Sequence, residues 1–307
     1  MAAKTSRWKT FLKSDIVWSY RHSPVTIVAS IIAALLVLMA VFAPWIAPYN
    51  PFNPATLNLM DGFTAPNSSS FSGKYFLMGT DNQGRDVLSS IMYGSRVSLF
   101  VGLLATLFAM VMGVGLGLVA GYVGGVVDAI IMRVADVQLS FPAILIALLI
   151  FGVARGLIPP NQQEGAAVWV LILAIGLANW AQFARTVRGA TMVERQKDYV
   201  AAARILGVNP IIVLLRHVLP NVLGPVLVIG TIGLALAIIE EATLSYLGVG
   251  VPPTQPSLGT LIRIGQQFLF SGEWWILLFP AVTLVLLALS VNLLGDWLRD
   301  ALNPKLR

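Results

Sequence analysis

The sequence predicts an all-α membrane protein with six transmembrane helices. Of its 307 residues, 57% are hydrophobic and 11% are charged, and the mean hydropathy is +0.81, whereas a soluble domain carries about a quarter charged residues. Six runs of 18 or more residues contain no Asp, Glu, Lys or Arg, and each approaches the roughly 20 residues that cross a bilayer as a helix. In lipid a helix satisfies its own backbone hydrogen bonds. A soluble bundle of buried helices, the alternative, would not leave six separate runs of this length.

The first predicted elements are an N-terminal segment, 1–24, and a span at 25–47. Aromatic residues alternate with Lys and Arg in the segment, which is typical of an amphipathic helix on the inner membrane surface. No clear small-residue cleavage site closes the apolar run that follows. We therefore expect a retained anchor rather than a removed signal peptide.

An external loop, 48–96, and a second span, 97–127, follow. The loop is rich in Pro, Asn, Ser and Gly, and it turns at Asp81–Gly84 before a short helix that leads into the span. The span carries Gly113, Gly117 and Gly121 on one helix face, a spacing that lets another helix approach closely. The same stretch fits a dinucleotide-binding fingerprint, but that pattern requires a strand followed by a helix. Helix packing is the interpretation we adopt.

The remaining elements follow from the other apolar runs and from the polar segments between them. They are a third span at 130–154, a fourth at 166–188, a cytoplasmic loop at 189–220, a fifth span at 221–245, an external loop at 246–273, a sixth span at 274–297 and a cytoplasmic tail at 298–307. Glu240 and Glu241 come after a charge-free run and are expected near the outer face. Because carboxylates are costly in lipid, at least one should face protein or an aqueous vestibule. The alternative is that both reach the external headgroups.

The basic residues fix the expected orientation. With the N-terminus inside, 15 of the 20 lysines and arginines fall on the cytoplasmic side, which is the positive-inside pattern. Both termini are therefore expected in the cytoplasm, with 48–96, 155–165 and 246–273 outside. The net charge of +6 is explained by topology, so a nucleic-acid partner is not expected.

Motifs for catalysis or cofactor binding are missing from the sequence. It contains no GxxxxGK[ST] phosphate loop, HExxH helix, G-x-S-x-G elbow or calcium loop. There is no cysteine, and the two histidines, His22 and His217, are far apart. We therefore predict that the chain is not an enzyme and that it binds no metal or cofactor itself.

The cytoplasmic loop contains a compact unit, Lys197 to Asn221. Tyr199, Ala202, Ala203 and Leu206 form an apolar stripe at helical spacing. Gly207 then suits a left-handed C′ position, and Asn209-Pro210 is typical of a new helix start, which should run to Leu219 and stop at Pro220. Two short helices with a sharp bend are expected, and they carry Arg204, Arg216 and His217.

Three roles are open for this unit. It could be an inert hairpin in the headgroups, a helix-turn-helix that binds DNA, or a docking element for a cytoplasmic partner. DNA binding is disfavoured because two flanking spans would hold the unit away from a major groove. Small Ala and Gly residues, which permit close approach, favour docking.

The unit resembles the EAA loop of the inner-membrane subunits of bacterial ABC importers, roughly E-A-A-x-x-x-G, nine variable residues, I-x-L-P. Ala202, Ala203 and Gly207 match, and residues 218–220 close the motif. Ala201 stands where the motif has its leading glutamate, a departure that affects a polar contact with the ATPase and not the geometry. Four further segments resemble the second permease subunit of dipeptide and oligopeptide importers, a subfamily that includes nickel and glutathione permeases: "MGTDNQGRDVLSSIMYGSRVSLFVG", "MRVADVQLSFPAILIAL", "EEATLSYLGVGVPPTQPSLGTLI" and "NLLGDWLRDALNP".

The resemblance implies a type I ABC-importer permease fold in the bacterial inner membrane. Its partners would be a second homologous permease, two ATPase subunits that hold ATP and Mg, and an external substrate-binding protein. Peptides would be the cargo, with nickel, glutathione or another small solute as the alternative. The resemblance aligns Glu241 with a recurring E-A-x-L-S motif, which favours a structural or gating role for this residue. It assigns coupling to the ATPase to one set of residues: Tyr199, Ala202, Ala203, Arg204, Gly207, Pro210 and Pro220.

A hypothesis from another class is a stand-alone secondary transporter or channel. Such a protein is expected to show broken helices and an ionisable relay at mid-depth. Here the ionisable residues near the spans lie at their ends, for example Asp128, Asp136 and Asp296. The importer subunit is therefore favoured.

Overall fold

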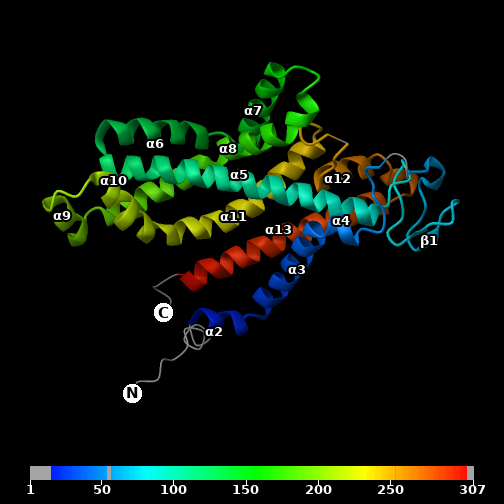
Figure 1. The fold of residues 1–307 in the computed structure, drawn as a ribbon, viewed down its shortest axis with the longest axis horizontal. Coiled ribbons are helices and arrows are strands. Elements are labelled where there is room, and N and C mark those ends of the chain that lie inside the picture. Colours follow the sequence, from blue (N-terminus) through cyan, green and yellow to red (C-terminus); the bar gives the residue numbers. More distant parts are fainter. Residues whose placement is uncertain (1–14, 54–56, 253, 303–307) are drawn as a thin grey trace.

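The computed structural model describes residues 15–53, 57–252 and 254–302, and helices dominate them (Figure 1). The predictions for residues 1–14 and 303–307 lie outside the described residues. The elements, in chain order, are α2 Asp15–Arg21, α3 Pro24–Val41, α4 Ala43–Ile46, η2 Leu59–Asp61, β1 Ser68–Ser69, β2 Tyr75–Phe76, α5 Val87–Val123, α6 Gly125–Leu139, α7 Ala143–Leu157, α8 Gln163–Glu194, α9 Asp198–Ile205, α10 Pro210–Val213, η3 Leu214–Val218, α11 Leu219–Tyr246, α12 Leu258–Gln266, η4 Leu269–Ser271 and α13 Trp275–Leu302.

Five helical segments of the described chain are long and apolar enough to cross a membrane. They are α3, α5, α8, the continuous stretch Pro210–Tyr246 and α13. A sixth candidate is the pair α6 and α7, which is long and apolar enough to span a membrane only if both helices count as one segment. The two helices are bent by 97° at their junction. The six predicted spans therefore correspond to five continuous helices and one broken pair.

The third span differs from its prediction as a single segment over 130–154. Helix α6 begins at Gly125, ends at Leu139 and gives way to α7 at Ala143. The break falls at Ser140-Phe141-Pro142, because proline lacks a backbone N–H and disfavours helical geometry in the residue before it. α6 lies along α8, where Gln138 Nε2 donates to the carbonyls of Leu177 and Ala178 at 2.7 and 2.8 Å.

The second predicted span, 97–127, is part of a longer helix. α5 covers 37 residues, about 55 Å at 1.5 Å per residue, which exceeds the roughly 30 Å hydrocarbon core. It begins ten residues earlier than the charge-free run, where the Asp86 side chain accepts a hydrogen bond from Ser89 N at 2.8 Å. It ends at Val123, because Gly124 follows with a φ of 74° that does not continue the helix. The expected leading helix is thus continuous with the span.

The bundle is built around α5 and α8, with α11 beside them (Figure 1). The largest buried cluster lies between α5, α7 and α8 and includes Val101, Ala105, Leu171 and Ile175. α13 packs against α11 and α3. A larger side chain on any of these faces would therefore collide with a neighbouring helix.

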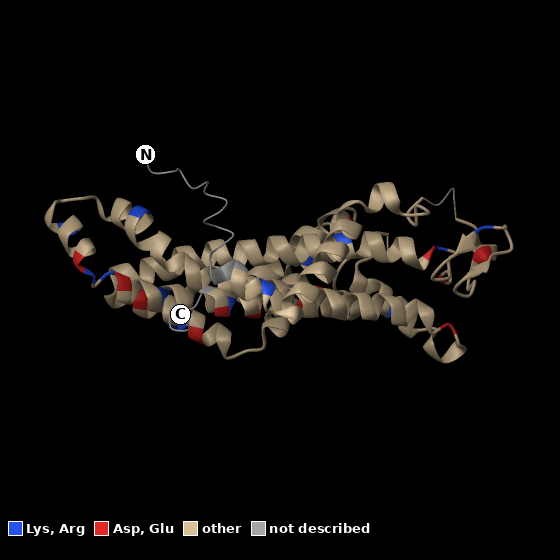
Figure 2. Cartoon of the chain, turned by 90° about the horizontal axis from the view of Figure 1, so that it is seen from below, with Lys and Arg blue, Asp and Glu red and all other residues tan. Residues whose placement is uncertain are grey.

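The bundle has two distinct ends, which we call the α9 end and the α12 end. α2 and the last turns of α13 lie toward the α9 end, and the β1–β2 hairpin and α4 lie toward the α12 end (Figure 1). Figure 2 shows acidic and basic residues gathered around the α9 end. The predicted loop 48–96 is tied to the bundle at the α12 end, where Trp275 Nε1 donates to the Thr80 carbonyl at 3.1 Å.

Candidate coupling site

The unit 197–221 forms a bent helical hairpin at the α9 end. Helix α9 ends at Ile205, and Gly207 follows with a φ of +70°, a left-handed conformation that glycine adopts at little cost. Asn209 then caps α10, since its side chain accepts from Ile211 N at 2.9 Å. The expected bend at Gly207 and the helix start at Asn209-Pro210 are both present.

Pro220 does not stop the second helix, contrary to the prediction. Residues 214–218 form a π-helical turn, and α11 begins at Leu219 directly after it. Proline is accommodated because it directly follows the π-helical turn, where the i→i−4 hydrogen-bond pattern is already interrupted. The His217 carbonyl beside it accepts from Asn221 Nδ2 at 2.8 Å. The hairpin is thus joined rigidly to a spanning helix.

The inner face of α9 differs from the predicted stripe. Val200 and Ala203 are buried with Val213, Val218 and Leu118 in one cluster. Ala203 is 7% exposed, whereas Ala202 and Leu206 face outward. The predicted stripe mixes the two faces, because the apolar residues of this short helix occur all round it.

Tyr199 and Arg204 hold the hairpin to the rest of the protein. The Tyr199 hydroxyl donates to Glu194, lies 3.3 Å from the His217 carbonyl oxygen, and accepts from Asn221 Nδ2 at 3.0 Å. Partial burial raises the pKa of Tyr199, and the bond to Glu194 raises it further, so the hydroxyl remains a donor at neutral pH. The Arg204 guanidinium lies 4.8 Å from the centre of the Tyr122 ring, a cation–π contact that ties α9 to α5.

The outer face of the hairpin is apolar, and none of the described residues covers it. Ile205, Leu206 and Ile211 are 86%, 80% and 65% exposed. Contiguous exposed apolar side chains of this size are typical of interaction surfaces. Sequence reasoning missed Ile205 and Ile211, although apolar residues on both sides of a bend glycine were a usable signal.

The three glycines of the predicted packing row contact α8 of the same chain. A Cβ at Gly113, Gly117 or Gly121 would lie 2.5, 2.5 or 2.7 Å from atoms of Phe183, Ala184 or Thr191, respectively. These distances are shorter than any ordinary van der Waals contact. The glycines therefore set how closely α5 and α8 approach.

The two glutamates of α11 have different surroundings. Glu241 is 0% exposed and accepts from Ser98 Oγ at 2.6 Å and from Ser245 Oγ at 2.7 Å. Ser98 in turn accepts from Leu258 N at 3.2 Å, so this carboxylate joins α11, α5 and α12. Glu240 is partly exposed and accepts from Asn179 Nδ2 at 2.7 Å. The expectation that at least one carboxylate faces protein is met, and the headgroup alternative is wrong for Glu241.

A family model described as "Binding-protein-dependent transport system inner membrane component" matches residues 113–307, which include the hairpin, the two glutamates and the α5–α8 contact. The chain belongs to this family. A second model, the N-terminal transmembrane domain of oligopeptide transport permease C, matches residues 8–66 of this permease.

Curated relatives of the permease agree with this assignment. The dipeptide transport system permease protein DppC of Escherichia coli K12 is 40% identical over 292 residues, covering 94% of this chain and 92% of the relative. The di/tripeptide permease protein DppC of Pseudomonas aeruginosa is 34% identical, covering 94% and 91%. A putative peptide transport permease of Brucella suis is 38% identical, covering 90% and 86%.

The fold of the permease is that of a type I ABC-importer permease, as predicted. A solved structure of the MetNI methionine ABC transporter in an inward-facing conformation matches with a TM-score of 0.55 and 19% identity, covering 70% of this chain and 96% of that one. By its family and its relatives, the chain is an inner-membrane transport subunit and not an enzyme. Family membership implies partnership with an ATPase and with a substrate-binding protein.

Proposed function

We propose that the chain is one of two transmembrane subunits of an ATP-driven importer that moves di- or oligopeptides across the bacterial inner membrane. The observation that carries this proposal is the 40% identity with a dipeptide permease over almost the full length of both chains. The alternative cargoes are nickel, glutathione or another small solute. A stand-alone secondary transporter is disfavoured by the family match.

The proposed assembly contains a second homologous permease, two ATPase subunits and an external binding protein. ATP and Mg would be held by the ATPase subunits. The outer face of the hairpin, Ile205, Leu206 and Ile211, would enter a groove of one ATPase subunit. Closure of that subunit would then move α11 as a rigid body, because the hairpin continues directly into this helix.

The residues predicted for coupling divide into three groups in this proposal. Ala202, Gly207 and Pro210 belong to the docking surface and the bend, Ala203 to the support beneath it, and Tyr199, Arg204 and Pro220 to its attachment. Glu241 is assigned a structural role, because it accepts from Ser98 of α5, which in turn accepts from Leu258 N of α12. Glu240 remains a candidate for gating.

The transport proposal is tested by reconstitution of the complete complex in proteoliposomes with its binding protein. Uptake of a radiolabelled dipeptide should require ATP on the side of the membrane that carries the ATPase subunits. It should stop when the binding protein is omitted from the opposite side. Uptake of nickel or glutathione but not of peptides would overturn the peptide assignment and identify the imported solute instead. Uptake driven by an ion gradient without ATP would overturn the importer assignment.

We also propose that both termini and the α9 end are cytoplasmic and that the α12 end is external. Support comes from the distribution of basic residues and from the common location of α2, α9 and the end of α13. Single cysteines at Ser69, Asn161 and Asn209 test it, since all three positions are exposed and the chain has no native cysteine. A membrane-impermeant thiol reagent should label the first two in intact cells. Labelling of Asn209→Cys but not of Ser69→Cys would contradict the proposed orientation and support the opposite one.

A further inference from the structure

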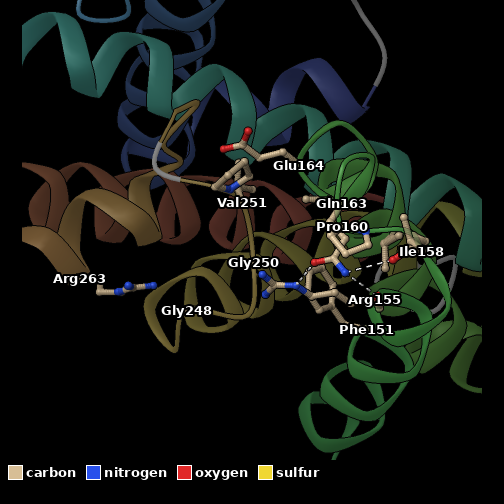
Figure 3. Close-up of a pocket in the computed structure, with 13 residues that line it drawn as sticks. Phe151, Arg155, Ile158, Pro160, Gln163, Glu164, Gly248, Gly250, Val251 and Arg263 are labelled. Atoms are coloured by element: carbon tan, nitrogen blue, oxygen red, sulfur yellow. Dashed lines mark hydrogen bonds between the residues drawn. The ribbon is translucent and has the colours of Figure 1, made fainter.

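A cavity of about 370 Å³ opens at the α12 end of the bundle (Figure 3). It lies between the end of α7, the start of α8, the segment 248–252 after α11, and α12. Its volume is within the range of about 300–1,000 Å³ that is usual for small-ligand sites. Part of its wall is apolar, with Phe151, Ala167, Val170 and Val251 buried there.

Two arginines reach this cavity from opposite sides. Figure 3 shows the Arg155 guanidinium directed toward Gly250 and the Arg263 guanidinium directed toward Gly248. A Cβ at Gly248 would lie only 2.5 Å from Arg263 Nη1, so the absence of a side chain there gives the guanidinium its place. Gln163 buttresses Arg155, since its Oε1 accepts from Arg155 Nε at 3.2 Å and its Nε2 donates to the Arg155 carbonyl at 3.2 Å.

Neither arginine is paired with an acidic side chain in the part of the chain that the structure describes. Within residues 15–53, 57–252 and 254–302, neither guanidinium lies within ion-pair distance of a carboxylate, and Arg263 has no hydrogen-bond partner. Other arginines of the chain are paired, for example Arg188 with Asp128 and Arg85 with Asp81. A carboxylate is the ligand that a guanidinium binds best, because its planar donors match the two oxygens.

An acidic group lies in the same cavity apart from both cations. Glu164, at the start of α8, accepts from Thr254 Oγ1 at 3.2 Å and has no cationic partner among the described residues. The cavity thus offers a cationic region, an anionic group and an apolar wall. A zwitterion with an apolar body has the complementary arrangement.

We propose that this cavity is a transit subsite of the permease for a short peptide, with the terminal carboxylate held by Arg155 and Arg263 and the terminal ammonium held by Glu164. Side chains of the peptide would lie against the apolar wall at Phe151 and Val251. This inference rests on the proposed function and adds to it a place where the permease itself contacts the cargo. The subsite would receive the peptide at the external end, before it passes between the spanning helices.

The test compares three versions of one dipeptide in the reconstituted complex: unmodified, C-terminally amidated and N-terminally acetylated. The binding protein is the same throughout, so a change in the uptake ratio between these peptides isolates the permease. The double variant Arg155→Gln, Arg263→Gln should lower uptake of the free acid about tenfold and leave that of the amide unchanged, as expected for loss of charge-assisted bonds. Glu164→Gln should reduce only the preference for the free amine.

Arg96→Gln is the matched control, because Arg96 is exposed on α5 near the same end and does not line the cavity. Arg263→Lys should keep part of the preference for the free carboxylate. A second measurement uses a photo-reactive dipeptide with both termini free, which should cross-link to the segments 155–163 and 248–263 in the wild type and not in the arginine double variant.

The outcomes separate this inference from the function on which it rests. Failure of the wild type to import any of the peptides would overturn the proposed function and the subsite together. Peptide uptake by the wild type with the same ratios in all variants, or with no cross-link in these segments, would overturn the subsite alone. A uniform loss of uptake of all three peptides would assign the cavity a purely structural role and would also overturn it.

Discussion

Replacement of Gly117 by alanine is expected to destabilise the permease, while the same replacement at Gly115 should not. A Cβ at Gly117 would lie 2.5 Å from the Ala184 carbonyl oxygen and 2.8 Å from Val187 Cβ. Backbone atoms cannot rotate away, so α8 must move, and such overpacking costs about 1–3 kcal/mol. Gly115 is exposed on the same helix, and a Cβ there would meet nothing within 4 Å.

The pair is a matched comparison, because both changes add one methyl group to the same helix. Alanine is favoured over glycine in a helix by about 1 kcal/mol, so Gly115→Ala should be neutral or slightly stabilising in this respect. The thermal stability of the purified permease complex in detergent and its yield from membranes measure the difference. Gly117→Leu should prevent assembly altogether. Equal stability of Gly117→Ala and Gly115→Ala would show that the α5–α8 contact tolerates a wider spacing.

The number and approximate positions of the spanning segments could be predicted from the sequence, because they depend on apolar length alone. The partner of the glycine row could not. A GxxxG spacing shows that some helix approaches closely, but α8, α11 and the second permease were equally available. The choice of α8 depends on the shapes of Phe183, Ala184 and Thr191, which periodicity does not describe.

The broken third span shows a different limit. Pro142 was visible in the sequence, and prolines occur inside other spanning helices of this chain, such as Pro225 in α11 and Pro280 in α13. Whether a proline bends a helix by 97° or is accommodated depends on what the freed carbonyls and neighbouring helices contact. The break at Pro142 is favoured because Gln138 hydrogen-bonds α6 to the backbone of α8 just before it.

At the candidate coupling site, the sequence predicted the position of the bend but not which face of α9 is buried. Gly207 and Asn209-Pro210 have local chemical reasons to turn, so their positions follow from the sequence. The direction in which Ala203 points depends on where α5 and α11 lie, since Leu118 and Val222 provide the cluster that it joins. The burial of Glu241 likewise depends on Ser98, which is 143 residues away.

The double variant Ile205→Arg, Leu206→Arg is expected to remain in the membrane but to lose coupling. The two side chains are 86% and 80% exposed, and neither belongs to a spanning helix, so insertion and folding should continue. Burial of one such side chain in a partner contributes about 1.5–3 kcal/mol, and each 1.4 kcal/mol is about tenfold in affinity. Loss of two should weaken ATPase binding by about a hundredfold or more.

Co-purification of the ATPase subunits and ATP hydrolysis stimulated by the loaded binding protein measure this coupling. Gln196→Arg is the control for charge, because Gln196 is exposed in the same loop and the change removes no apolar surface. Normal subunit recovery, normal stimulated hydrolysis and normal uptake in the double variant would return the hairpin to an inert element in the headgroups.

Gly207→Ala tests the same site through the backbone. A Cβ at Gly207 would meet nothing within 4 Å, but its φ of +70° is unfavourable for alanine by about 1 kcal/mol. Gly73 has a φ of +78° and equally open surroundings at the other end of the protein, so Gly73→Ala imposes a similar strain away from the hairpin. If the bend aims Ile205 and Leu206 at the ATPase, Gly207→Ala should lower stimulated hydrolysis several-fold and Gly73→Ala should not. Equal activity of the two variants would show that the conformation of the bend does not transmit the ATPase motion.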